Sequence, residues 1–133
     1  MEIREYTTYR ESEILSLYTS VGWTAYTDDL NALQNGFAHS LLTLAAYDGE
    51  QLLGLIRAVG DGYTIVFIQD ILVHPNFQRN GVGTALMRAM LARFPAVRQI
   101  ELAADDTPQA LAFYRAMGFR TFSELGCNGF MRA

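Results

Sequence analysis

The amino-acid sequence predicts an α/β fold in which a mixed, mostly antiparallel central sheet is flanked by helices. Apolar runs between residues 41 and 73 are separated by short turns, as in an antiparallel meander. Segments before and after these runs instead repeat their apolar residues at the spacing of a helix face. Half of the 133 residues are apolar and no linker interrupts them, so we expect one packed domain over residues 1–133.

The N-terminal third of the chain predicts a short strand followed by two helices. Residues 1–6 suit a strand, and a helix begins at about Ser12 and ends at Gly22. The run Thr27-Asp28-Asp29 can cap a second helix, with its acidic side chains at the positive end of the helix dipole. The apolar face of this second helix consists of Leu30, Leu33 and Phe37.

The middle of the chain predicts three consecutive antiparallel strands. The first two, residues 41–47 and 51–59, flank the turn dipeptide Asp48-Gly49. A second tight turn at Gly60-Asp61-Gly62 leads into residues 63–73, which are rich in β-branched and aromatic side chains. The three strands therefore form a meander.

A helix and a further strand are predicted after this meander. Apolar side chains recur there at spacings i, i+3, i+4, i+7 and i+8, which is one face of a helix. They are Val82, Ala85, Leu86, Ala89 and Met90. Pro95 ends this helix, and residues 99–103 suit a strand.

The last quarter of the chain predicts a helix and the strands that complete the sheet. Pro108 suits the first turn of a helix, and Gly118 suits its end. We expect residues 119–125 and a final stretch near Phe130 to be strands. We expect Cys127 to pack as a small apolar group.

Charge and composition exclude several classes of protein. The net charge is −4, and the ten basic residues, all of them Arg, are scattered singly, which argues against a nucleic-acid partner. The absence of Lys excludes Schiff-base chemistry and a phosphate site built on lysine. No apolar stretch reaches the roughly 18 residues of a membrane span, and the N-terminus lacks the layout of a signal peptide. We therefore expect a cytoplasmic protein with no membrane partner, and the spacing of its histidines predicts no metal site.

The segment from Gln78 to Thr84 is the most informative part of the chain. It lies between an apolar strand and an amphipathic helix, and it contains Gly81 and Gly83. Glycine lets the backbone approach a ligand closely, and free N–H groups at a helix N-terminus suit a pyrophosphate. The alternative is a tight turn that binds nothing. A dinucleotide fingerprint is excluded because its third glycine is missing.

These residues resemble the signature of the GNAT superfamily of N-acetyltransferases. Val73-His74-Pro75 and then Gln78-Arg79-Asn80-Gly81-Val82-Gly83 resemble its first half, a strand end followed by Q/R-x-x-G-x-G/A. The segment from Phe113 to Phe119 resembles its second half, an aromatic helix that ends in Y-x-x-x-G-F. The resemblance extends over nearly the whole chain, and it implies the GNAT fold with splayed central strands and acetyl-CoA as co-substrate.

The resemblance also implies how acetyl-CoA is bound. The pantetheine arm would lie between the strand that ends at Val73 and the strand that begins near Gln99, and it would pair with backbone groups like an added strand. The implied pantetheine contacts are Ile71, Leu72 and Val73. The implied pyrophosphate contacts are Gln78, Arg79, Asn80, Gly81, Val82, Gly83 and Thr84. The Arg79 side chain either adds a charge-assisted contact or is a solvated loop charge.

The chemistry implied is direct attack of an amine on the thioester carbonyl. Tyr114 lies where the family usually has its general acid, although packing against the sheet is the alternative role. A base is less evident, since the family often has Glu or His near the position of Gln69. Asp70 can serve if a bulge re-aims it; a carboxylate bonded to neighbouring backbone and a water relay are the alternatives.

The sequence thus predicts an enzyme that acetylates a primary amine of a small molecule. Candidates for the acceptor pocket are Trp23, Tyr26 and Tyr63, each of which can instead be a core residue. The alternative function is a non-catalytic acyl-CoA-binding sensor module. An apolar segment over residues 125–131 can supply the edge of a homodimer.

Overall fold

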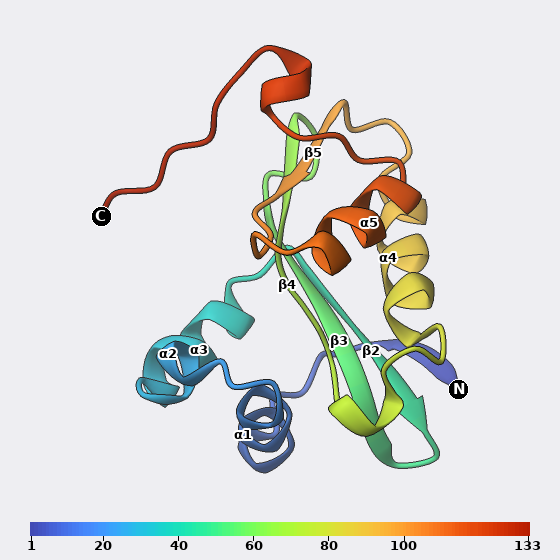
Figure 1. Cartoon of the computed structure of the whole chain (residues 1–133). Coiled ribbons are helices and arrows are strands. Elements are labelled where there is room, and N and C mark those ends of the chain that lie inside the picture. Colours follow the sequence, from blue (N-terminus) through green and yellow to red (C-terminus); the bar gives the residue numbers. More distant parts are fainter. The chain divides into compact units, whose positions relative to one another are not determined.

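The computed structural model describes the whole chain, residues 1–133, as two compact units (Figure 1). The first unit comprises residues 1–103 and the second comprises residues 104–133. The first contains a five-stranded sheet with helices on both faces. The second contains one helix and a short 3₁₀ turn. None of the helices combines the length and the apolar character of a membrane span.

The sheet of the first unit follows the chain in the order β1-β2-β3-β4-β5. Its strands are β1 (Glu2–Glu5), β2 (Leu42–Asp48), β3 (Gln51–Gly60), β4 (Ile65–Val73) and β5 (Gln99–Leu102). The first four strands pair antiparallel, and β5 pairs parallel to β4. The predicted mixed, mostly antiparallel sheet is therefore confirmed, as is the meander in the middle of the chain.

Helices cover the two faces of this sheet unequally (Figure 1). One face carries α1 (Glu11–Ser20), α2 (Thr24–Thr27) and α3 (Leu30–Ala38), and the other carries α4 (Val82–Ala92). The predicted cap of α3 is confirmed, since the Asp29 carboxylate accepts from the Ala32 N–H at 3.0 Å. The four-residue helix α2 was not predicted, because it is too short to show an apolar period.

A continuous apolar core joins α1 and α3 to the sheet. Ile14, Leu17 and Leu33 pack with Leu55 and Leu72, and all five side chains are buried. Burial of each large aliphatic side chain contributes about 1.5–3 kcal/mol to folding. On the opposite face, α4 buries Leu86, Met87 and Met90. The core therefore holds β3 and β4, which carry the candidate site, between two layers of helix.

The turn between β3 and β4 is built around one carboxylate. Asp61 accepts from the backbone N–H groups of Tyr63, Thr64 and Ile65 and from the Thr64 hydroxyl, at 2.6 to 3.1 Å. These hydrogen bonds, above all the one from the Thr64 side chain, hold the pKa of the Asp61 carboxyl well below its usual range. The ionised form is thus stabilised by folding.

Asp61→Ala should lower the melting temperature (Tm) at pH 7, because three backbone donors lose their acceptor. The stabilising effect of Asp61 is complete above the pKa of the unfolded chain, about 3.9, and is lost as the pH falls further through the depressed folded pKa. Thermal unfolding of both proteins at pH 7 and at several values below 4 tests this. The difference in Tm should narrow at low pH, and a constant difference would contradict the linkage.

The second unit consists of α5 (Pro108–Ala116) and a 3₁₀ turn, η2 (Ser123–Leu125). The Thr107 hydroxyl caps α5 by accepting from the Ala110 N–H at 3.1 Å, and Gly118 follows the helix with a φ of 95°. This helix is where the sequence predicts it.

The strands predicted over residues 119–125 and near Phe130 are absent, so that prediction is wrong. Thr121 and Glu124 form a reciprocal capping box: the Glu124 carboxylate accepts from the Thr121 N–H, and the Thr121 hydroxyl accepts from the Glu124 N–H. This local pairing favours a helical turn over an extended strand. Cys127 is exposed rather than packed.

Candidate active site

Strands β4 and β5 part halfway along β4. Their parallel pairing ends at Ile68 and Leu102, whereas β4 continues to Val73. The backbone of residues 69–73 therefore has no strand partner on the β5 side. This is the splay that the predicted fold requires, and it leaves an open edge along which an extended ligand can pair.

Antiparallel pairing with β3 decides which backbone groups face this open edge. The His74 N–H donates to the Leu53 carbonyl at 2.8 Å, so His74 is in a hydrogen-bonded pair. Alternation along β4 then turns the N–H and C=O of Leu72 toward β3 and those of Ile71 and Val73 toward the open edge. Of the three predicted pantetheine contacts, Ile71 and Val73 thus present backbone groups at the open edge, whereas Leu72 pairs with β3 and buries its side chain in the core.

The segment from Gln78 to Thr84 connects this open edge to α4. The Gln78 amide donates to the Val73 carbonyl at 3.1 Å, which ties the start of the loop to the end of β4. Arg79 and Gly81 adopt left-handed backbone with φ values of 67° and 81°. No side chain caps α4, so the N–H groups of its first turn have no acceptor within the helix.

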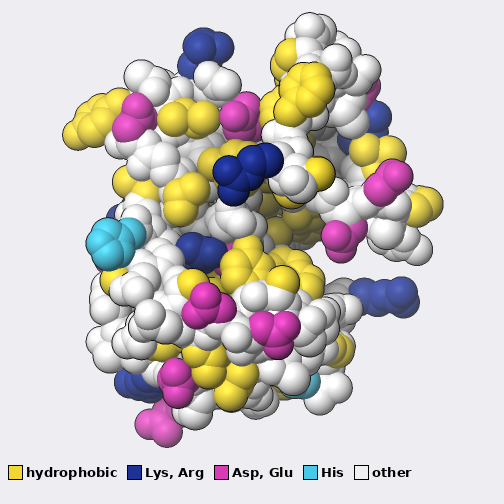
Figure 2. Space-filling view, turned by 90° about the vertical axis from the view of Figure 1, so that its left-hand side faces the viewer, with side chains coloured by type: hydrophobic (Ala, Val, Ile, Leu, Met, Phe, Trp, Pro, Cys, Tyr) yellow, Lys and Arg dark blue, Asp and Glu magenta, His cyan; other side chains and the backbone are white.

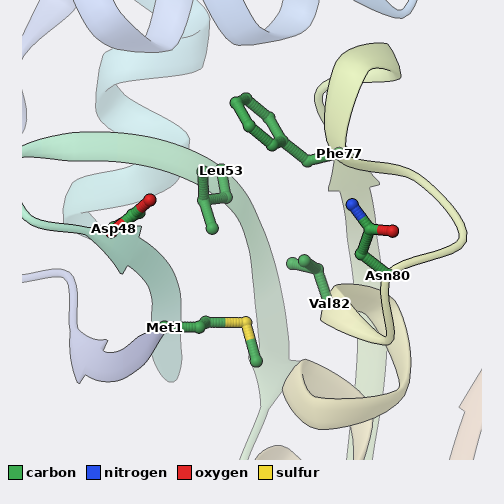
Figure 3. A pocket seen from close by; sticks show the side chains of 6 residues that line it. All are labelled: Met1, Asp48, Leu53, Phe77, Asn80 and Val82. Atoms are coloured by element: carbon green, nitrogen blue, oxygen red, sulfur yellow. The ribbon is translucent and has the colours of Figure 1, made fainter.

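A pocket of about 240 Å³ lies beside this loop (Figure 3). Phe77, Asn80 and Val82 form the loop side of the pocket. Met1, Asp48 and Leu53 complete the wall from the N-terminus and the β2–β3 hairpin. A methyl group built on Gly81 would meet no atom of the chain within 4 Å. The backbone of the loop can therefore be approached closely by a ligand, as a pyrophosphate cradle requires.

A β-bulge at Gln69 changes the direction of the residues that follow it. Arg57 pairs with Asp70 and its neighbour Ala58 pairs with Ile68, so Gln69 is left unpaired. Cross-strand partners share a face, which places Asp70 on the face of α1 and α3 and Ile68 on the face of α4. Strict alternation would have put both on one face. The bulge that a role of Asp70 as a base would require is therefore present.

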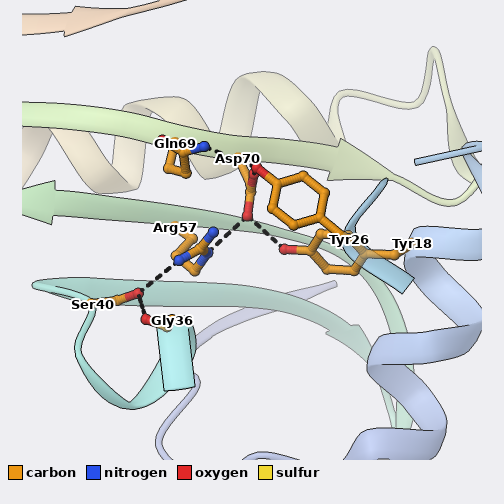
Figure 4. Close-up of polar contacts among 7 residues, drawn as sticks. All are labelled: Tyr18, Tyr26, Gly36, Ser40, Arg57, Gln69 and Asp70. Atoms are coloured by element: carbon orange, nitrogen blue, oxygen red, sulfur yellow. Dashed lines mark hydrogen bonds and ion pairs between the residues drawn. The ribbon is translucent and has the colours of Figure 1, made fainter. Parts of the chain in front are cut away.

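Asp70 is the centre of a buried polar cluster (Figure 4). Its Oδ2 accepts from Arg57 Nε and from the Tyr18 hydroxyl, each at 2.7 Å, and its Oδ1 accepts from the Tyr26 hydroxyl at 2.6 Å. Asp70 is 1% exposed and Arg57 is 5% exposed. The Gln69 amide donates to the Tyr26 oxygen at 2.9 Å and extends the cluster to the surface. We call these five residues the Asp70 cluster.

The charges in the Asp70 cluster are compensated. Burial alone would lower the pKa of Arg57, but the charge of Asp70 and their hydrogen bond outweigh it and raise the pKa. Burial and then the proximity of Asp70 raise the pKa of Tyr18. Burial and the hydrogen bond to Asp70 likewise raise the pKa of Tyr26. At neutral pH the cluster therefore contains one ion pair and two neutral phenols.

Asp70 is a poorly placed base for a substrate amine. Both its oxygens accept hydrogen bonds within the chain, and Oδ2 is also in an ion pair with Arg57. These contacts favour the alternative of a structural carboxylate, although its partners are side chains from distant segments and not neighbouring backbone.

The candidate acceptor residues have three different environments. Tyr26 lines a pocket of about 260 Å³ between α2, α3 and β3. Trp23 packs edge to face on Tyr18 with ring centroids 6.1 Å apart. Tyr63 is 86% exposed in the β3–β4 turn and lines neither pocket. The other residues of the Tyr26 pocket are Ala25, Asp29, Ala32, Leu33, Gly36 and Arg57.

Tyr114 belongs to the second unit, so its role beside the sheet stays a prediction. Its ring packs edge to face on Phe113 and Phe119, with centroids 5.1 and 6.2 Å apart. Burial, and then the charge of Asp105, raise the pKa of the Tyr114 hydroxyl. The phenol therefore keeps its proton at neutral pH, which a proton donor requires.

Two members of the Asp70 cluster, Tyr18 and Arg57, were not predicted. Arg57 is a single charge inside the apolar run of β3, from Leu52 to Val59. A charged residue at such a position is buried only with a partner, which is the signal that could have predicted the ion pair. Tyr18 looked like a core residue because it lies on the apolar face of α1.

Comparison with known proteins identifies the family. Residues 8–119 match the acetyltransferase (GNAT) family, and the chain belongs to it. A solved GNAT family acetyltransferase from Streptococcus pneumoniae has a TM-score of 0.90 and 38% identity, over 99% of this chain and 96% of that one. Acetyl-CoA-dependent acetyl transfer is general for this family.

Curated relatives are longer than this chain. An uncharacterized N-acetyltransferase of Gracilaria tenuistipitata is 32% identical over 82% of this chain and 61% of its own length. A histone acetyltransferase of Glycine max is 31% identical over 84% of this chain and 52% of its own length. The chain thus spans less than two thirds of either relative.

On the face shown in Figure 2, the Arg side chains lie apart from one another and form no continuous basic patch. Acidic side chains are interspersed with them and with hydrophobic ones.

Proposed function

We propose that this chain transfers the acetyl group of acetyl-CoA to a primary amine of a small molecule. One observation carries the proposal: the open edge of β4 is followed, after a 3₁₀ turn (Pro75–Phe77) and a short loop, by the uncapped N-terminus of α4. The open edge suits the amides of pantetheine, and the N-terminus suits the pyrophosphate. Family membership supports the same assignment.

The residues that bind acetyl-CoA divide into two groups. The backbone groups of Ile71 and Val73 pair with the pantetheine amides. The N–H groups from Arg79 to Thr84 donate to the pyrophosphate, while Gln78 holds the loop to β4. The chain's only buried cation, Arg57, is already paired with Asp70, so it is not a phosphate ligand.

The reaction is a direct displacement. The amine nitrogen attacks the thioester carbonyl carbon, a C–N bond forms, and the C–S bond breaks. The leaving thiolate takes a proton from the Tyr114 hydroxyl, the amine loses a proton to solvent, and solvent returns a proton to the Tyr114 phenolate. The products are the N-acetyl amine and free CoA.

The size of the acceptor pocket supports a small molecule. Its volume of about 260 Å³ is just below the roughly 300–1,000 Å³ typical of pockets for drug-sized ligands. Its wall is mostly apolar and includes one acidic group, Asp29, and one basic group, Arg57, which is paired with Asp70. The name of the Glycine max relative, a histone acetyltransferase, instead points to a protein acceptor. The test therefore includes small amines and a lysine side chain.

Release of free thiol from acetyl-CoA in the presence of amines tests the proposal. A panel of small primary amines is compared with a lysine-containing peptide, and mass spectrometry identifies the acetylated product. Acetylation of a small amine supports the proposal. Acetylation of the peptide alone would show that the acceptor is a protein and not a small molecule. A rise in Tm with acetyl-CoA but no amine-dependent thiol release would instead favour the non-catalytic sensor module.

Gly81→Ala should weaken acetyl-CoA binding, because a Cβ on the cradle would project into the space that the pyrophosphate needs. Gly22→Ala is the matched control: its φ is 76°, and a Cβ there also meets no atom within 4 Å. Left-handed backbone costs a side-chain-bearing residue about 1–2 kcal/mol, so both variants should lose similar stability. Calorimetry should show a higher Kd for acetyl-CoA in Gly81→Ala but not in Gly22→Ala. Equal Kd values for acetyl-CoA in the two variants would show that the loop is not part of the binding site.

A further inference from the structure

The hydrogen bonds of the Asp70 cluster have only one possible direction. An ionised carboxylate accepts and cannot donate, so the hydroxyls of Tyr18 and Tyr26 must both donate to Asp70. Tyr26 has one hydroxyl hydrogen, and this contact uses it. Its oxygen can therefore only accept further hydrogen bonds.

This direction also decides the orientation of the Gln69 amide. The contact of 2.9 Å between Gln69 and the Tyr26 oxygen must be a donation from the Gln69 NH₂ group. The carbonyl Oε1 of Gln69 is then left without a partner in the chain. Gln69 is exposed and is the bulged residue of β4, next to Ile68, where the pairing with β5 ends.

A chain of hydrogen bonds thus leads from the point where the strands part to the buried carboxylate. Two acceptor sites lie at its outer end, a lone pair of the Tyr26 oxygen and the Oε1 of Gln69. Successive hydrogen bonds polarise one another, so Asp70 strengthens both acceptors without contacting the ligand. The buried ion pair with Arg57, 2.7 Å between Nε and Oδ2, fixes Asp70 at the inner end of this chain.

We propose that the Tyr26 oxygen and Gln69 Oε1 bind the N–H groups of the acceptor amine and aim its lone pair into the gap between β4 and β5. Asp70 is the positioning residue that holds these two oxygen atoms in place. The remainder of the acceptor occupies the pocket of about 260 Å³ that Tyr26 lines. This inference rests on the proposed function, and it names the groups that recognise a primary amine.

In this arrangement Gln69 orients the amine and does not act as a base. A Gln side chain cannot take up a proton at neutral pH, so it cannot replace a base. It can orient an amine that reaches the site already deprotonated. The bulge and the amide orientation together suit that task.

Tyr26→Phe and Gln69→Leu test the inference, with Tyr18→Phe as the matched control. Tyr18 and Tyr26 donate to the same carboxylate, but Tyr18 is fully buried, whereas Tyr26 is half-buried and lines the pocket. Loss of one hydrogen bond to the amine should raise the amine KM about tenfold in Tyr26→Phe and in Gln69→Leu. The Kd of acetyl-CoA should not change.

Tyr18→Phe should lower Tm without raising the amine KM. The inference is overturned if the wild type is active and Tyr26→Phe and Gln69→Leu keep its amine KM, or if Tyr18→Phe raises KM as much as they do. Absence of any amine-dependent thiol release by the wild type would refute both the proposed function and this inference. The thiol assay thus distinguishes the two failures.

Discussion

Tyr114→Phe should lower the turnover of amine acetylation by about 10²-fold or more while leaving the Kd of acetyl-CoA unchanged. The substitution removes the proton that the thiolate would take and keeps the ring that packs on Phe113 and Phe119. The hydroxyl of Tyr114 makes no hydrogen bond within the chain, so Tm should change little. The raised pKa of the phenol ensures that the wild type is protonated at the pH of the assay.

Steady-state kinetics at saturating acetyl-CoA, with the Kd measured by calorimetry, provides this comparison. Phe113→Leu is a control, because it alters the packing around Tyr114 without removing the hydroxyl. A large loss of turnover confined to Tyr114→Phe supports general acid catalysis. Unchanged turnover would remove Tyr114 from this role and would leave the family assignment intact.

Arg57→Met should reduce the free energy of unfolding by about 3–5 kcal/mol, because it leaves the Asp70 carboxylate buried without its counter-ion. The tyrosine hydroxyls cannot replace the positive charge. The same substitution also removes the donor to the Ser40 hydroxyl and the packing of the guanidinium over the Phe37 ring. Urea denaturation at neutral pH measures the loss.

Two comparisons separate charge burial from general damage. Arg93→Met breaks the exposed ion pair with Glu5 and should cost less than about 1 kcal/mol. The double variant Arg57→Met/Asp70→Leu should recover part of the stability lost in Arg57→Met, since no charge is left buried. A double variant with the summed losses of the two single variants would show that the ion pair is not the cause.

The strands, turns and capped helices of the first unit could be predicted because each depends on neighbouring residues. The Asp48-Gly49 turn, the Asp29 cap and the apolar face of α4 are all encoded within a few positions. The same local logic could have corrected the C-terminal prediction, since the spacing from Thr121 to Glu124 is that of a capping box. Apolar content alone favoured a strand there.

The chain by itself determined the family motif, the glycine loop ahead of α4 and the meander that presents β4. Only the tertiary structure decided that Asp70 faces α1 and that Leu72 turns its backbone toward β3. It also decided that the Tyr26 oxygen and Gln69 Oε1 are left able to accept further hydrogen bonds. The reason is physical. These properties depend on the bulge at Gln69 and on the contacts of Asp70 with Tyr18 and Tyr26, which lie 52 and 44 positions away in the sequence. A local pattern cannot specify such pairs, because they form only when packed elements bring distant side chains together.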